Sequence, residues 1–228
     1  MHPIPMLEEC GPADHFTWPK SSQKDRILRI GNKVTEERGI DKIEYKAKGD
    51  MIFIHQQRTI WNKELEDQDD NWGVKERRIH VFRPPSIPTS ASSSPISSTS
   101  STPLESNTNT KEADISFTYT PTSPLLFRYS ALTFNAHKIH YDHPHTLTHE
   151  QQRTLLVHGP LTATLLIELA VQAGLNKNKE LVGFEYRAVG PIYVDEEVEM
   201  SGSWDGVGLG LEARQGGRVG MKANATFA

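Results

Sequence analysis

The sequence lacks the features of several protein classes. Cys10 is the single cysteine among 228 residues, so the chain cannot form an internal disulfide, which suits a reducing compartment. No apolar run reaches the ~18 residues of a membrane span, which predicts a soluble protein that does not enter a membrane. Lys and Arg number 25 against 29 Asp and Glu, and they are scattered, so no nucleic-acid partner is expected.

The N-terminus also lacks a recognisable targeting signal. It has no apolar signal-peptide core, and Glu8, Glu9 and Asp14 are unlike the acid-poor composition of a mitochondrial transit peptide. On this observation alone, we expect an intracellular protein in the cytoplasm.

Motifs for metals, phosphates and nucleophilic serines are missing as well. Six histidines between residues 137 and 158 are potential metal ligands, but they form no His-Glu-x-x-His motif and have no cysteine pair beside them. The chain has no glycine-rich phosphate loop and no Gly-x-Ser-x-Gly motif. We therefore expect neither a metal nor a cofactor.

A low-complexity segment divides the chain. From Pro84 to Pro103, 17 of 20 residues are Pro, Ser or Thr, and polar residues continue to Asp114. Such a composition buries too little apolar surface to offset the entropy lost on ordering. It predicts a disordered linker over residues 84–114 between an N-terminal part, residues 1–83, and a C-terminal part, residues 115–228.

The N-terminal part reads as strands without a long helix. Residues 1–24 contain four prolines and predict little regular structure. Apolar residues at 27–30, alternation around Val34, and the runs 51–61 and 74–83 predict strands.

The C-terminal part reads as a strand, a central helix and four more strands. Pro160 suits the first turn of a helix, and Leu161, Leu165, Leu166 and Leu169 follow at helical spacing. Apolar residues on nearly all sides predict that other structure wraps this helix. Near the C-terminus, the sequence Gln-Gly-Gly at 215–217 predicts a hairpin turn.

Polar residues just before this helix are candidates for a site. A histidine suits proton transfer near neutral pH, which makes His140 a candidate acid and base; the alternative is a core histidine held by a neighbour. Asn135 is either a ligand anchor or a turn residue, and Asp142 is expected to hold backbone or a histidine ring. The free N–H groups beside Gly159 suit a carbonyl that gains negative charge; the alternative is a plain loop entering a helix.

Two stretches, YSALTFNAHKIHYD and VHGPLTATLLIELA, resemble the hydratase motif of the MaoC-like, or type 2, enoyl-thioester hydratases. The branch they resemble contains hydroxyacyl-thioester dehydratase type 2 and the mesaconyl-CoA (C4) and itaconyl-CoA hydratases. The resemblance implies an α+β hot-dog fold, in which a long antiparallel sheet wraps one central helix and which is often duplicated. It thus implies a double hot dog whose N-terminal half is incomplete, without its first strand and helix, and a mitochondrial location.

The resemblance also assigns the site. In the commonest form of the motif, an Asp and a His hold and activate the catalytic water, and Asn135 and His140 occupy these positions. His137 occupies the intermediate polar position, and Gly159 supplies the backbone donor to the thioester, with His158 and Pro160 beside it in the substrate-binding group. Because an Asn amide orients a water but cannot take its proton, His140 is expected to transfer the proton.

The implied reaction is the reversible dehydration of a 3-hydroxyacyl thioester of CoA or acyl carrier protein to a trans-2-enoyl thioester, in fatty-acid or dicarboxylic-acid metabolism. A homodimer is expected from the fold. Two alternatives stay open: a non-catalytic hot-dog subunit that binds thioesters or stabilises a dimer, and an acyl-CoA thioesterase. A thioesterase would need a carboxylate base near the helix start, and Glu168 lies two turns inside the apolar helix, a poor place for one. Arg128, Arg153 and Arg187 are candidate partners for the free carboxylate of a diacid substrate.

Overall fold

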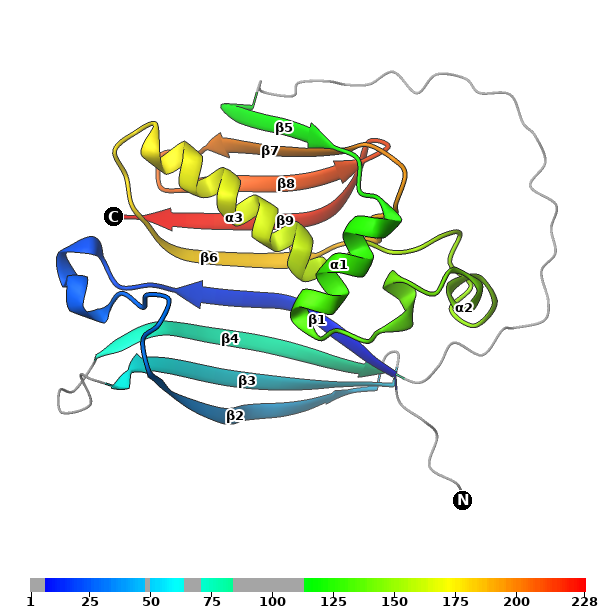
Figure 1. Cartoon of the computed structure of the whole chain (residues 1–228), viewed down its shortest axis with the longest axis horizontal. Coiled ribbons are helices and arrows are strands. Elements are labelled where there is room, and N and C mark those ends of the chain that lie inside the picture. Colours follow the sequence, from blue (N-terminus) through cyan, green and yellow to red (C-terminus); the bar gives the residue numbers. More distant parts are fainter. Residues whose placement is uncertain (1–6, 48–49, 64–70, 84–112) are drawn as a thin grey trace.

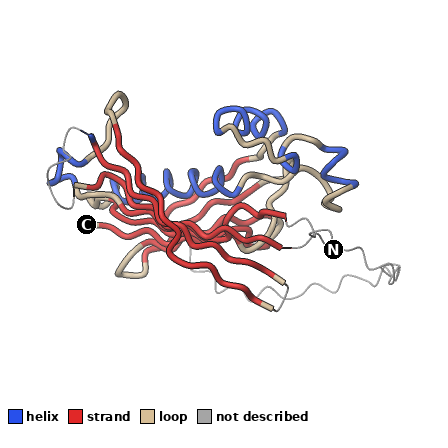
Figure 2. Tube along the Cα trace, turned by 90° about the horizontal axis from the view of Figure 1, so that it is seen from below, coloured by secondary structure: helices blue, strands red, loops and turns tan. Residues whose placement is uncertain are grey.

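The computed structural model describes residues 7–47, 50–63, 71–83 and 113–228. In this part of the chain, nine strands form one antiparallel sheet, and helices α1 and α3 lie on the same side of it (Figures 1 and 2). The strands are β1 (Leu7–Thr17), β2 (Val34–Lys46), β3 (Met51–Asn62), β4 (Trp72–Arg83), β5 (Ile115–Tyr119), β6 (Leu181–Ala188), β7 (Val198–Trp204), β8 (Leu209–Gln215) and β9 (Arg218–Phe227). The helices are α1 (Ser123–Thr133), α2 (His143–Thr148) and α3 (Gly159–Leu175), with short 3-10 helices η1 (Ser21–Arg26) and η3 (Lys138–His140).

The strand order shows an internal duplication. The sheet runs β2-β3-β4-β1-β6-β9-β8-β7-β5. Outward from the centre, the N-terminal half places β1, β4, β3 and β2, and the C-terminal half places β6, β9, β8 and β7 in the corresponding order, with β5 outermost. The two innermost strands, β1 and β6, pair antiparallel, with Asp14 opposite Tyr186. This arrangement confirms a double hot dog, in which β5 and α3 have no counterpart among the described N-terminal residues.

Helix α3 forms the core of the C-terminal half. Pro160 lies in its first turn, where a missing N–H breaks no helical hydrogen bond. Leu166 and Ala170 have no exposed surface and pack against strands of the C-terminal half. Near the helix end, a Cβ on Gly174 would lie 2.7 Å from the Phe227 ring of β9, so a residue without a side chain lets the helix approach the sheet. The predicted central helix is therefore confirmed.

No described helix covers the N-terminal strands (Figure 1). Because side chains alternate along a strand, Asp14, Arg78 and Glu76 lie on the sheet face that α3 covers further along. They continue into an ionic network: Arg78 donates to Glu76 at 2.5 Å, and Arg58 contacts both Glu76, at 3.3 Å, and Glu36. The N-terminal half thus carries charged side chains on the sheet face where the C-terminal half carries its hydrophobic core.

Some predicted elements need correction. The first 24 residues were expected to lack regular structure, yet β1 occupies the centre of the sheet, where its pairing to β4 and β6 outweighs its weak local pattern. Residues 27–30, expected as a strand, lie outside the strands, between η1 and β2. The strands predicted at 51–61 and 74–83 and the hairpin turn are confirmed, and Gly216 and Gly217 adopt φ values of 54° and 76° there.

Most of the predicted linker, residues 84–112, lies outside the described residues. Its last residue, Asp114, belongs instead to the folded C-terminal half, because its Oδ2 accepts a hydrogen bond from the Trp204 backbone N–H at 2.8 Å. The division of the chain into the three predicted segments otherwise stays a prediction.

Candidate active site

His140 is held in one tautomer by a backbone contact. It ends η3, is 5% exposed, and its Nδ1 lies 2.8 Å from the carbonyl oxygen of Leu156. A carbonyl oxygen can only accept, so Nδ1 carries the proton and Nε2 keeps its lone pair. Burial lowers the pKa of His140 to about 4, although the hydrogen bond to Leu156 acts in the opposite direction and raises this pKa. The ring is therefore neutral at pH 7, with Nε2 available as a base.

The carbonyl that orients His140 belongs to a braced segment. The Leu156 backbone N–H donates to Ile139 at 3.0 Å, and Val157 N–H donates to Ile192 at 2.8 Å. Leu156 also forms a bridge with Tyr193. Backbone contacts on both sides thus hold in place the carbonyl that accepts from the His140 ring.

His158 stacks on His140. The ring centroids are 3.7 Å apart with an interplanar angle of 19°. His158 has no exposed surface, its Nε2 lies 2.8 Å from Ser130 Oγ, and Tyr129 packs on its ring edge at 4.8 Å between centroids. Burial, and then the neighbouring His140, lower the pKa of His158 to about 3. The buried His158 ring is thus placed to support the His140 ring, and its predicted substrate-binding role stays a prediction.

Asn135 makes the turn contact that the sequence left as an alternative. Its Oδ1 accepts from the His137 backbone N–H at 3.0 Å. Because an N–H donor requires the amide oxygen, this hydrogen bond fixes the amide orientation, and the Nδ2 donors face away from it. Asn135 can therefore offer its Nδ2 hydrogen-bond donors to a ligand.

The other two polar residues of the motif differ in position. His137 is exposed, and its ring meets His140 edge-on, with centroids 5.7 Å apart. Asp142 caps α2, where its Oδ1 accepts from the His145 backbone N–H at 3.0 Å. Asp142 thus holds backbone, one of the two roles expected from the sequence.

The start of α3 provides the electropositive edge of the site. His158 is the N-cap residue, and Gly159 and Pro160 open the helix, both half-buried. The Gly159 and Leu161 N–H groups belong to the first turn and lack a helical partner. The nearest atom to a Cβ built on Gly159 is Met221 Cε at 3.9 Å, so the space beside this backbone is open. A carbonyl oxygen can approach these donors and the positive end of the helix dipole.

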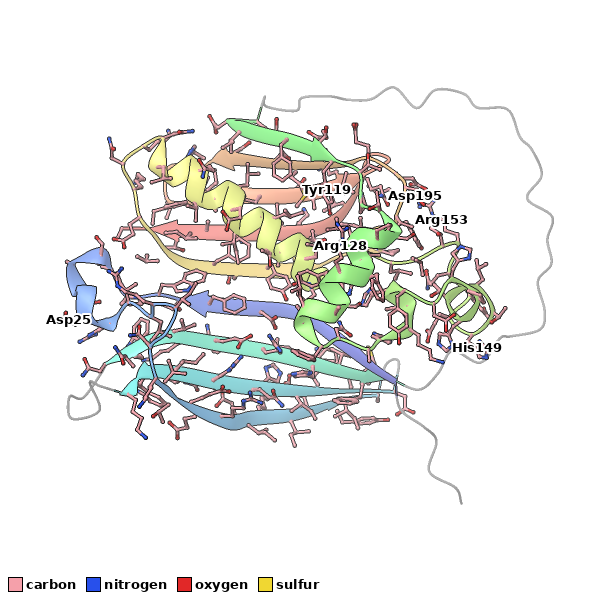
Figure 3. All side chains as sticks on the ribbon, viewed as in Figure 1. Asp25, Tyr119, Arg128, His149, Arg153 and Asp195 are labelled. Atoms are coloured by element: carbon pink, nitrogen blue, oxygen red, sulfur yellow. The ribbon has the colours of Figure 1, made fainter. Side chains whose placement is uncertain are left out.

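Sequence reasoning missed Ser130, Tyr129 and Leu156, which hold the two histidines. No sequence motif indicates these three residues, because their contacts with the histidines arise only when α1 and the loop at Leu156 pack beside them. Of the arginines considered for a diacid, Arg153 is engaged: it pairs with Glu196, at 2.7 Å for one contact, and lies 4.1 Å over the Tyr193 ring. Figure 3 shows Arg128 on α1 and Arg153 on the loop before α3.

The six histidines do not gather as ligands. Among the described residues, no group of three or more His, Cys, Asp or Glu side chains is placed to hold a metal ion. His145 and His149 instead stack on one another, with centroids 4.7 Å apart. Within the same residues, no helix is long and apolar enough to cross a bilayer.

The fold and the site define a hot-dog protein with two stacked, buried histidines beside the start of its central helix. The chain belongs to the family described as hydroxyacyl-thioester dehydratase type 2, whose profile matches residues 14–194. This finding confirms the family that the motif indicated.

Two curated relatives extend the comparison. The chain is 35% identical over 168 residues to the mesaconyl-C(4)-CoA hydratase of Chloroflexus aurantiacus, covering 73% of this chain and 53% of that protein. It is 34% identical over 85 residues to the mitochondrial hydroxyacyl-thioester dehydratase type 2 of Schizosaccharomyces pombe, covering 37% of this chain and 28% of that protein. The chain therefore spans about half of the first relative's length and less of the second's.

Solved structures share the fold. A MaoC-like dehydratase from Phytophthora capsici superposes with a TM-score of 0.66 at 12% identity, covering 100% of this chain and 73% of that one. At this identity the likeness concerns the fold alone, and the reaction has to be argued from the site.

Proposed function

We propose that this chain carries the site of a hydro-lyase that reversibly hydrates a trans-2-enoyl thioester of CoA or acyl carrier protein to a 3-hydroxyacyl thioester. The observation that carries the proposal is the fixed tautomer of His140, which directs proton-accepting Nε2 away from Leu156 in a ring kept neutral by burial. Family membership and the named reactions of both curated relatives support the same reaction class.

In hydration, the thioester carbonyl accepts hydrogen bonds from the first turn of α3 near Gly159. These donors stabilise the negative charge that develops on the carbonyl oxygen as the enolate forms. Asn135 donates through Nδ2 to the oxygen of a water, and His140 Nε2 takes a proton from that water as its oxygen bonds to the β-carbon. The proton then passes from His140 to the α-carbon, so the water is added and the base is restored. Dehydration follows the same steps in reverse.

His158 is a positioning residue in this scheme. Its stacked ring prevents His140 from rotating about its hydrogen bond to Leu156, and Ser130 anchors His158 in turn. Burial first, and then the charge of neighbouring His137, lower the pKa of His140, which keeps the base free of a proton at neutral pH.

The test is the hydration of crotonyl-CoA, mesaconyl-CoA and itaconyl-CoA by the purified protein, followed as loss of enoyl-thioester absorbance. We expect His140→Ala to lower kcat by about 10²–10⁴-fold, the usual contribution of a general base. His149→Ala, which changes an exposed histidine of the same region, is the matched control and should retain activity. A folded wild-type protein that hydrates none of the three compounds would contradict the proposal for these substrates.

The two alternative functions give different results in the same assay. A thioesterase would release free CoA without loss of the double bond; Glu168, its only candidate carboxylate in the sequence analysis, is exposed on α3. A non-catalytic subunit would do neither, and the uncovered N-terminal half is the observation that favours it.

A homodimer is part of the proposal. The exposed Ile40, Ile43 and Tyr45 of edge strand β2 leave apolar surface that a second copy would cover. Light scattering coupled to size-exclusion chromatography should give twice the chain mass, and a monomeric mass would contradict the proposal. We also propose a mitochondrial location, as named for the S. pombe relative, which microscopy of the tagged protein would test.

A further inference from the structure

A groove lies on the sheet face opposite α3. Its volume is about 610 Å³, and it crosses the junction of the two halves at β4, β1 and β6. Phe184 and Tyr186 of β6 belong to the core beneath α3. Because side chains alternate along a strand, Glu185 and Arg187 point to the other face. Their partners on β1, His15 and Ala13, point to the same face.

The floor of the groove is small and apolar, and its rim carries several cations beside the carboxylates of Asp41 and Glu185. Ala13 is paired with Ile79 on one side and with Arg187 on the other, so a methyl group forms the bottom. Arg77 lies opposite His15 on β4, and Lys222 lies opposite Arg187 on β9. All of these residues line the same cavity.

Two of the rim cations have no anionic partner in the described part of the chain. Lys222 reaches Glu212 at 3.3 Å, and Glu185 is engaged by Asn224 at 3.2 Å and by His15 at 3.6 Å. The guanidinium groups of Arg77 and Arg187 form no ion pair or hydrogen bond with another described residue. Their charges therefore remain available to a ligand.

The spacing of these two arginines suits a ligand with more than one anionic group. They flank β1 on strands two positions apart and are offset by two residues, which places their Cα atoms about 12 Å from one another. Long side chains from both sides can converge over Ala13. A planar guanidinium binds phosphoryl oxygens through two parallel hydrogen bonds, a geometry that an ammonium lacks.

We propose that this groove binds a ligand carrying two linked phosphoryl groups, with Arg77 and Arg187 each holding one. The site is separate from the hydro-lyase proposal, because it depends on neither His140 nor α3 and opens on the other face of the sheet.

Isothermal titration of the full chain with inorganic pyrophosphate at low ionic strength tests the proposal. We expect saturable binding with one site per chain, and weaker binding of inorganic phosphate, which is too short to engage both arginines. Arg77→Gln and Arg187→Gln should each weaken pyrophosphate binding about tenfold, the scale of one charge-assisted contact. Arg218→Gln, an exposed arginine outside the groove, is the matched control and should bind like the wild type.

Lysine variants keep the test valid if a glutamine variant fails to fold. Arg77→Lys and Arg187→Lys preserve the charge, remove the forked geometry, and should weaken binding severalfold. The proposal is overturned if the wild type shows no saturable binding, if phosphate binds as tightly as pyrophosphate, or if Arg218→Gln weakens binding as much as the groove variants do.

Discussion

The two halves of the sheet share one strand order but differ in what covers them. In the C-terminal half, the face beneath α3 carries Phe184, Tyr186, Ala223 and Ala225, all buried. In the N-terminal half, the same face of the continuous sheet carries charged side chains that pair with one another, from Asp14 through Arg78 and Glu76 to Arg58. One strand order thus supports a hydrophobic core on one side and a partly exposed ionic network on the other.

The difference shows how the site is supported. The elements that hold His140 and His158 through hydrogen bonds and ring contacts belong to the C-terminal half, namely α1, η3, the loop at Leu156 and the start of α3. The N-terminal half contributes continuity of the sheet, because β1 pairs with β6 and caps its otherwise open edge. A polar bond crosses from the ionic network to the core, because the Tyr186 hydroxyl donates to Asp14 at 2.6 Å.

The largest expected difference between the halves lies in stability. Leu166→Ala removes a side chain with no exposed surface beneath α3, and should lower the free energy of unfolding by about 2–5 kcal/mol because it leaves a cavity. Ile43→Ala in β2, where the side chain is 62% exposed, should change it by less than about 0.5 kcal/mol. Equilibrium unfolding in urea measures both, and similar losses in the two variants would contradict the comparison.

The buried histidines make the C-terminal half sensitive to acid. The folded pKa of His140 is lowered from 6.5 to about 4, so the unfolded chain binds a proton first as the pH falls. The stability that the folded protein has from a neutral His140 is fully present above pH 6.5 and is lost between pH 6.5 and about 4. This loss amounts to roughly 3 kcal/mol in the free energy of unfolding.

A histidine variant separates this effect from other titrations. In His140→Phe, the slope of unfolding free energy against pH between pH 6 and 5 should fall by about 1 kcal/mol per pH unit, because one fewer proton is taken up on unfolding. His149→Phe, at an exposed position, should leave the slope unchanged. Equal slopes for wild type and His140→Phe would show that His140 is not kept neutral in the folded protein.

Alanine substitutions at two glycines, one in each half, are expected to give the smallest difference in stability. In β9, a Cβ on Gly220 would lie 2.4 Å from Ile192 Cγ1, so Gly220→Ala should cost about 1–3 kcal/mol through overpacking. In β2, a Cβ on Gly39 would meet nothing within 4 Å, and Gly39→Ala should be neutral or slightly stabilising, since a strand glycine is costly to order. Thermal unfolding of the two variants compares them, and a large loss for Gly39→Ala would mean that this face is covered in solution.

Much of the fold was predictable because it depends on local patterns. The length and periodicity of α3, the runs at β3 and β4, and the two glycines of the last turn each specify one conformation within a few residues. The resemblance to the family motif likewise indicated Asn135, His140 and Gly159 as candidate site residues. β1 could not be predicted, because its strand is stabilised by partners on both sides and its own sequence shows little alternation.

The sequence by itself determined the family, the duplicated sheet and the position of the motif before a central helix. The tertiary structure decided how the residues of the candidate site are held. Leu156, 16 residues after His140, fixes the ring tautomer, and Ser130, 28 residues before His158, anchors the ring stacked on it. Such contacts depend on how α1, the loop and α3 pack together in space, and no spacing along the chain encodes them.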